Sequence, residues 1–89
     1  YAGINYYISG QYEDARIDFE MLKKIHPEWP DLNILLLKTY LKTGAVDQAK
    51  SYAQKINPSI KTNDLQSFSD SFSLSYAYYS SYQGNYGPN

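Results

Sequence analysis

The chain has 89 residues, a net charge of −1 and no cysteine. Its length allows one small domain, and a hydrophobic content of 43% against a charged content of 19% favours a folded chain over a disordered one. A weakly acidic chain offers no cationic field for a polyanion, so nucleic acid and anionic membrane surfaces are poor candidate partners. Without cysteine there are no disulfides and no thiolate metal sites, and the compartment stays open with a lean towards the cytoplasm.

No apolar run is long enough to cross a bilayer, so membrane insertion is not expected. The chain starts at Tyr1 rather than at Met, inside a stretch that already has a helical pattern. We therefore expect a fragment or a processed chain.

The first predicted helix runs from the start of the chain to Gly10. Ala2, Gly3 and Tyr6 fall on one face of it. Gly10 can adopt the left-handed conformation that ends a helix, at no steric cost.

A second helix is predicted after Gly10. It has carboxylates in its first turn, where the helix dipole favours them, and apolar residues at helical spacing after that. The pair His26-Pro27 ends it, because a residue before proline disfavours helical geometry. The apolar residues are Ala15, Phe19, Leu22 and Ile25.

The next two predicted helices repeat this pattern at an offset of 34 residues. They cover Leu32 to Lys42 and Asp47 to Ile56, with a break at Thr43-Gly44 and a stop at Asn57-Pro58. Such a fixed offset is typical of repeat proteins. The matching pairs are Tyr6 and Tyr40, Gly10 and Gly44, Ala15 and Ala49, Phe19 and Ala53, and Leu22 and Ile56. Ala15 and Ala49 are expected where two helices cross, because a small residue lets the helix axes come close, with Tyr6 and Phe19 filling the space beside the crossing.

The pattern resembles the tetratricopeptide repeat family. Ala2-Gly3-x-x-Tyr6 and Gly10-x-Tyr12-x-x-Ala15-x-x-x-Phe19-x-x-Leu22 follow its two helices, and Pro27 falls on its closing proline. The second unit is weaker, with Leu36-Leu37 in place of Leu-Gly and Pro58 about three residues early. The resemblance covers residues 1 to 58. It implies an all-α fold of helix-turn-helix repeats stacked as a right-handed α-solenoid, in about two and a half repeats.

A third helix is predicted over residues 64–83, with Asn63 as N-cap and Gln66 completing a capping box. Its apolar stripe is Leu65, Phe68, Phe72, Tyr76 and Tyr79, and Gly84 would end it. Two alternatives compete with this helix. Serine alternates from Ser67 to Ser75 as in a strand, and the Ser and Tyr bias is also typical of a disordered tail.

These elements divide the chain into five segments. Residues 1–29 form the first repeat, with its first helix truncated, and residues 30–58 form the second. Residues 59–63 are a linker, residues 64–83 the third or capping helix, and residues 84–89 a tail.

The family resemblance implies a binding groove along the first helix of each repeat. By position, its residues would be Ile4, Tyr7, Ile8, Ile34, Lys38, Leu41 and Lys42, joined by Leu74, Tyr78 and Tyr82 if the third helix belongs. Such a surface suits an apolar partner segment with an acidic flank. The same apolar side chains could instead pack against a neighbouring repeat.

No motif predicts catalysis, a metal site or a cofactor. His26 is the single histidine and fits a polar turn residue, and Glu13-Asp14 is explained by its place at a helix start. Ordinary helix-surface ion pairs are expected between Arg16 and Glu20. An enzyme is therefore not expected.

The sequence favours a non-enzymatic scaffold that binds a partner peptide or helix on its concave face. The first alternative is a structural segment of a larger multidomain or solenoid protein without a ligand of its own, whose exposed ends could associate. The second is a Tyr- and Ser-rich interaction tail over residues 67–89.

Overall fold

The computed structural model describes residues 2–74, and this part of the chain is helical and has no strand. The predicted all-α class is confirmed over this range. The elements are α1 (Ala2–Ile8), α2 (Tyr12–Ile25), α3 (Asp31–Thr43), α4 (Val46–Gln54), the short 3-10 helix η1 (Thr62–Asp64) and α5 (Leu65–Asp70).

The same glycine cap ends α1 and α3. Gly10 and Gly44 both have φ of 81°, the left-handed region that a side chain disfavours. The amide of Gln11 donates to the carbonyl of Tyr6 at 2.8 Å. Thirty-four residues later, the amide of Ala45 donates to the carbonyl of Tyr40 at 2.9 Å. These bonds satisfy last-turn carbonyls and fix the reversal of the chain, so both predicted stops are confirmed.

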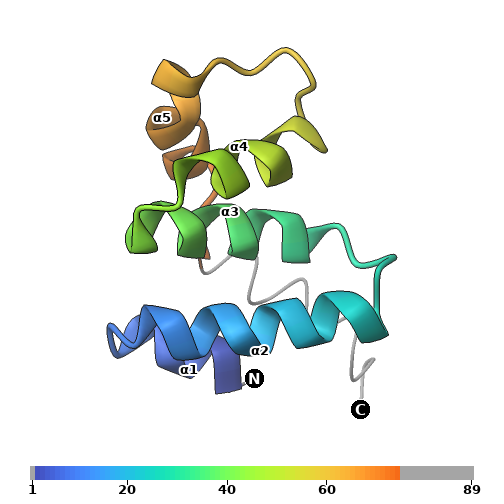
Figure 1. Cartoon of the computed structure of the whole chain (residues 1–89), viewed down its shortest axis with the longest axis vertical. Helices are drawn as coiled ribbons and strands as arrows, with labels where there is room; N and C mark the ends of the chain where they lie inside the picture. Colours follow the sequence, from blue (N-terminus) through green and yellow to red (C-terminus); the bar gives the residue numbers. More distant parts are fainter. Residues whose placement is uncertain (1, 75–89) are drawn as a thin grey trace.

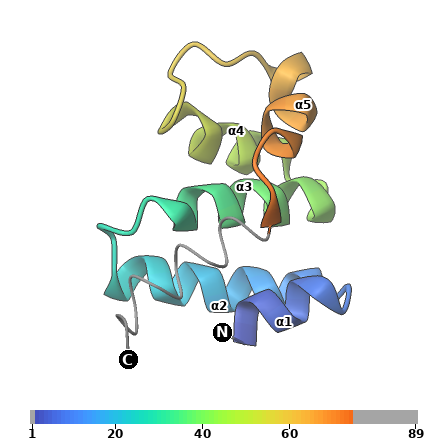
Figure 2. The same cartoon turned by 180° about the vertical axis from the view of Figure 1, so that it is seen from behind.

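The helices stack in chain order (Figure 1). Each of α2, α3 and α4 packs against the helix before it, and α5 lies against α3 and α4. Figures 1 and 2 show α1 and α2 at one end of the stack and α5 at the other. Helix α3 therefore has neighbours on nearly all sides, and every residue from Ile34 to Tyr40 is buried. A helix that is buried all round tolerates the almost continuous apolar run seen here.

Small residues lie at the helix crossings, as the sequence predicted. Ala15 in α2 and Ala49 in α4 have no exposed surface. In α1 the contact is closer still, because a Cβ added to Gly3 would lie 2.6 Å from Cε1 of Phe19. The amide of Gly3 also donates to Oδ2 of Asp18 at 2.9 Å. Glycine is thus required at this crossing by close approach.

Two apolar predictions are wrong. Tyr6 was expected to fill space beside the first crossing but is 37% exposed, since α1 has α2 as its main neighbour. Ile56 was expected inside the fourth helix, at the position that matches Leu22, but is 38% exposed. Helix α4 ends at Gln54, and the amide of Ile56 donates to the carbonyl of Ala53 in a turn that takes the side chain off the buried face.

The predicted helix over residues 64–83 is interrupted. Helix α5 ends at Asp70, and residues 71–73 are not helical. Serine hydroxyls compete for the helix carbonyls here: Ser67 donates to Asp64 and Ser71 to Phe68. The predicted capping box is also wrong, because η1 precedes α5 without a side-chain cap, and Gln66 instead donates to Asp70 at 3.0 Å.

The segment that follows still packs on the core. Phe68 and Phe72 meet edge to face with ring centroids 5.2 Å apart, and both contact the buried cluster, as does Leu74. The predicted continuation to residue 83, the stop at Gly84 and the tail 84–89 lie outside the described residues.

Candidate functional site

The predicted groove residues of α1 and α3 fall into three groups by exposure. Ile8 and Lys42 are exposed, and Tyr7 and Leu41 are half-buried. Ile4, Ile34 and Lys38 are buried, with 1%, 6% and 9% of their surface exposed. Tyr78 and Tyr82 lie outside the described residues. The structure therefore leaves fewer of these side chains open to a partner than the sequence suggested.

Two tyrosines and a lysine meet on this face, and we call them the tyrosine–lysine surface. The rings of Tyr7 and Tyr12 meet edge to face, with centroids 5.2 Å apart and an interplanar angle of 69°. The ammonium of Lys42 lies 5.8 Å from the centre of the Tyr12 ring, within cation–π range. Three different helices contribute these residues, α1, α2 and α3, so the surface exists only because the helices pack.

The position of Lys42 follows from its local structure. It is the basic residue in the last turn of α3, where a cation is favoured by the helix dipole. Tyr12 is the first residue of α2, directly after the Gly10 turn, which brings it back beside α1. Sequence reasoning used Tyr12 as a motif residue of the second helix and did not place it in the groove. Its position directly after a glycine turn was the available signal.

Lys38 joins α3 to α5 instead of lining an open groove. Its ammonium donates to the Ser69 carbonyl at 2.7 Å and lies 3.5 Å from the Ser69 hydroxyl oxygen. Because Ser69 is in the last turn of α5, the cation meets a carbonyl at the negative end of that helix dipole. Burial lowers the pKa of Lys38 below that of a free lysine, and the neighbouring Asp70 carboxylate opposes this shift.

Asp70 places an acid at the edge of the tyrosine–lysine surface. Burial raises the pKa of Tyr7, and electrostatic interaction with the neighbouring Tyr12 and Asp70 side chains adds to that shift. The Asp70 carboxylate thus raises the pKa of both Tyr7, which belongs to α1, and Lys38, which belongs to α3. Only the packing of α5 against α3 brings Asp70 here.

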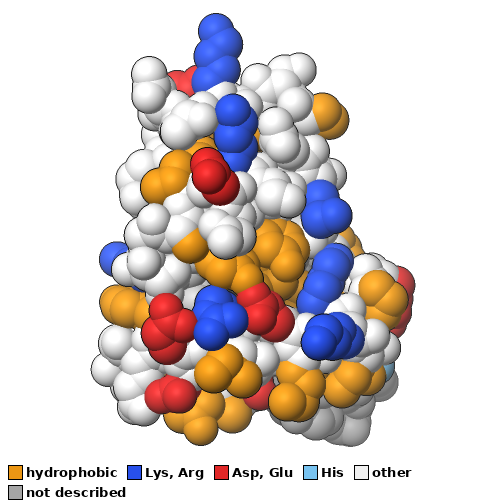
Figure 3. All heavy atoms as spheres, viewed as in Figure 1, with side chains coloured by type: hydrophobic (Ala, Val, Ile, Leu, Met, Phe, Trp, Pro, Cys, Tyr) orange, Lys and Arg blue, Asp and Glu red, His pale blue; other side chains and the backbone are white. Residues whose placement is uncertain are grey.

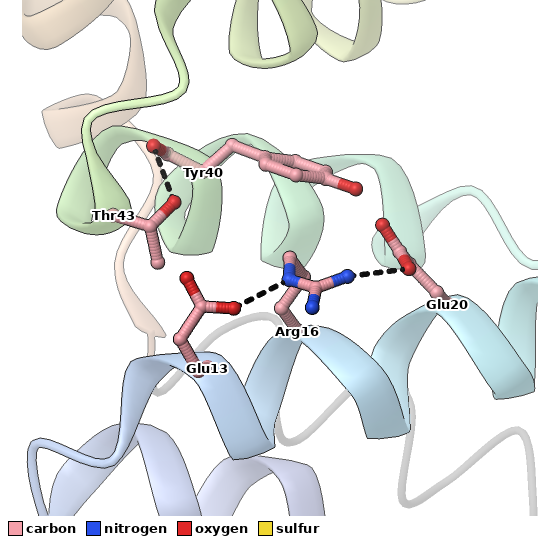
Figure 4. A network of polar contacts seen from close by, with 5 residues as sticks. All are labelled: Glu13, Arg16, Glu20, Tyr40 and Thr43. Carbon is pink, nitrogen blue, oxygen red and sulfur yellow. Dashed lines mark hydrogen bonds and ion pairs between the residues drawn. The ribbon is translucent and has the colours of Figure 1, made fainter.

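A second polar cluster lies between α2 and α3 (Figure 4). Arg16 donates to Glu13 at 2.7 Å and to Glu20 at 2.9 Å, so the predicted pair with Glu20 is confirmed. In Figure 4 the Tyr40 ring lies on the α3 side of this cluster. That ring stacks on Tyr52 of α4 with centroids 5.7 Å apart. Two carboxylates share the single guanidinium of Arg16, so the cluster as a whole keeps one negative charge.

The residues considered for chemistry are held in local contacts. His26 follows α2 and stacks on Trp29, with ring centroids 4.0 Å apart, and its Nδ1 lies 3.2 Å from a carboxylate oxygen of Glu28. Over residues 2–74 there is no group of three or more His, Cys, Asp or Glu side chains that could hold a metal ion. The tyrosine–lysine surface presents two aromatic rings and an ammonium group.

None of the helices in the described range has the length and apolar character needed to cross a membrane. Compared with models of known protein families, with curated proteins and with solved structures, the chain matches none of them.

Proposed function

We propose that this chain is a non-enzymatic protein-interaction module of the tetratricopeptide type, in which helix pairs continue as a right-handed solenoid. The proposal is supported by the two identical glycine caps at Gly10 and Gly44 and by helices that pack mainly on their neighbours in the chain. The observation that carries the binding function is the tyrosine–lysine surface, where Tyr7, Tyr12 and Lys42 meet from three helices.

The partner is a peptide or helix that has an apolar or aromatic side chain beside an acidic one. The half-buried rings of Tyr7 and Tyr12 supply flat apolar area at low conformational cost, as at many binding surfaces. The exposed ammonium of Lys42 would pair with the partner's carboxylate. The carboxylate of Asp70, which acts on Tyr7, would repel an acidic group of the partner near that ring.

A selection from a random peptide library on the immobilised chain tests this function. We expect enriched peptides to combine Asp or Glu with Phe, Leu, Ile or Trp. Lys42→Glu and Tyr12→Ala should each raise the Kd of a selected peptide about tenfold or more, equivalent to roughly 1.4 kcal/mol. The matched control is Lys61→Glu, because Lys61 is an exposed lysine outside this surface. Selected peptides that bind all three variants equally well would contradict the proposal.

A second candidate function is a structural segment of a larger helical array. It is favoured by the large apolar side chains exposed on α2, where Ile17 is 51%, Met21 56% and Ile25 62% exposed. A further helix pair stacked on this end would cover them. A chain cut at that point should then associate without a fixed stoichiometry, which separates this candidate from a closed oligomer.

A further inference from the structure

The outer face of α2 has an apolar stripe with charges of opposite sign at its two ends. Ile17, Met21 and Ile25 recur every four residues and are more than half exposed. At 3.6 residues per turn such positions share one face of a helix. In Figure 3, apolar side chains gather over α2 and along the lower end of the stack. The buried face of the same helix, which includes Ala15 and Phe19, points the other way.

The charges at the ends of the stripe follow the helix dipole. Acidic residues fill the first turn of α2 and basic residues fill the last turn. Of these, Asp14 and Lys24 lie on the stripe itself, three residues before Ile17 and three residues after Met21. Both are exposed, and neither forms an ion pair with another residue that the structure describes.

This pattern is complementary to itself when two α2 helices lie antiparallel. If Ile17 of one copy faces Met21 of the other, Asp14 of each copy faces Lys24 of the other, because 14 + 24 equals 17 + 21. A two-fold axis generates both contacts twice, as an isologous interface requires. In a parallel pair, by contrast, the acidic ends would meet each other and the basic ends would meet each other.

We propose that the outer face of α2 is a homodimer interface, occupied by a second copy of this chain in antiparallel orientation. A single pair of 14-residue helices is a small contact. It belongs with weak interfaces, so dimerisation is expected at roughly 10 µM to 1 mM protein. The interface lies on α2 and leaves the tyrosine–lysine surface free, so this inference does not depend on the proposed peptide binding.

Sedimentation equilibrium of the full chain at low salt tests the dimer. The wild-type chain should fit a monomer–dimer equilibrium, and Met21→Lys should abolish the dimer. The matched control is Val46→Lys, because Val46 is also an exposed apolar residue, 41% exposed, but lies on α4. Circular dichroism of each variant confirms that the fold is kept. A wild-type chain that stays monomeric, or that associates beyond the dimer into larger species, would overturn the proposal.

A charge exchange tests whether the charges of Asp14 and Lys24 take part in the interface. Asp14→Lys makes both ends of the stripe basic and Lys24→Glu makes both acidic, so each variant alone should dimerise about tenfold more weakly or worse. An equimolar mixture restores two attractive contacts and should dimerise about as well as the wild type. No gain on mixing would contradict the antiparallel pairing.

Cross-linking gives an independent readout that needs no charge reversal. The chain has no cysteine, so single cysteines can be introduced without competing thiols. On mild oxidation, a mixture of Asp14→Cys and Lys24→Cys chains should give more cross-linked heterodimer than either variant gives homodimer. Equal yields of the three products would argue against this interface.

Discussion

The two helix pairs, α1–α2 and α3–α4, share their turns but fill their crossings in opposite ways. In the first pair the small residue is Gly3 on the first helix and the large one is Phe19 on the second. At the positions 34 residues later, the large residue is Leu37 on α3 and the small one is Ala53 on α4. The side-chain volume at the crossing is therefore divided differently between the two helices of each pair, although both crossings are fully buried. What is kept is the fit across the crossing rather than the residue at each position.

The two helix pairs also differ at the residue that follows Gly3 in α1 and Leu37 in α3. Ile4 of α1 is buried with 1% exposed, and its counterpart in α3 is Lys38, buried with 9% exposed. An isoleucine needs only apolar neighbours, whereas a buried lysine needs acceptors, which α5 supplies through Ser69. The second pair is therefore adapted to a helix that follows it.

The largest expected effect comes from placing a charge at a crossing. Ala49→Asp would bury a carboxylate where the alanine has no exposed surface, so we expect loss of the folded state near room temperature. Ala15→Asp should do the same if the two crossings are equivalent. The control is Gln48→Asp, at the exposed neighbouring position of α4. Thermal unfolding followed by circular dichroism measures all three. A folded Ala49→Asp would refute this account of the crossing, and different outcomes for Ala49→Asp and Ala15→Asp would refute equivalence of the two crossings.

Exchanging the large and the small residue between positions 3 and 19 tests whether the two crossings are filled in opposite ways. Gly3→Leu should cost about 3 kcal/mol or more, because even a Cβ there would lie 2.6 Å from Phe19. Phe19→Ala should cost about 3–5 kcal/mol through the cavity it leaves. The double variant has the same arrangement as Leu37 and Ala53. Its loss of unfolding free energy should be smaller than the sum of the two single losses by at least about 1 kcal/mol. Denaturant unfolding gives these values, and additive losses would count against the volume exchange.

The smallest expected effect concerns Lys38. Lys38→Ile places at position 38 the residue found at the equivalent position 4. The change should reduce the hydrogen-exchange protection of residues 65–70, because it removes the bond from the ammonium to the Ser69 carbonyl. At neutral pH the change in unfolding free energy should be about 1 kcal/mol, since the lost charged hydrogen bond is offset by the relieved burial of a cation.

The pH dependence of this variant has a definite sign. Burial lowers the pKa of folded Lys38 below 10.5, so the folded state releases its proton before the unfolded state does. The wild-type chain should therefore gain stability relative to Lys38→Ile as pH rises from the lowered value towards 10.5. Tyr7 and Tyr52 have raised pKa values and act in the opposite direction, but they are present in both chains and cancel in the difference. A difference that does not change between pH 7 and pH 10 would show that Lys38 is not desolvated.

Local signals in the sequence predicted the turns and the crossings well. Gly10 and Gly44 were recognised because glycine is the residue that ends a helix in the left-handed conformation, and both have φ of 81°. Ala15 and Ala49 were recognised because a small residue amid large ones marks a close approach. In these cases the controlling physics lies within a few residues of the position.

Exposure was predicted less well, because it depends on which element covers a residue. Tyr6 and Tyr40 match in sequence, yet Tyr40 is 8% exposed and stacks on Tyr52, while Tyr6 is 37% exposed. Position 52 is occupied by tyrosine, but the corresponding position of the first pair holds Asp18, which accepts a bond from Gly3 instead. A periodic pattern identifies a face of a helix but not what packs on it.

The sequence by itself determined the helical class, the places where α1, α2 and α3 end, and the small residues at the crossings. Each of these follows from backbone preference or from side-chain volume. The tertiary structure alone decided the burial of Lys38 against Ser69 and the meeting of Tyr7, Tyr12 and Lys42. These features join residues up to 31 positions apart, from Lys38 to Ser69. Contacts over such separations form only when the helices pack, so no local pattern in the chain encodes them.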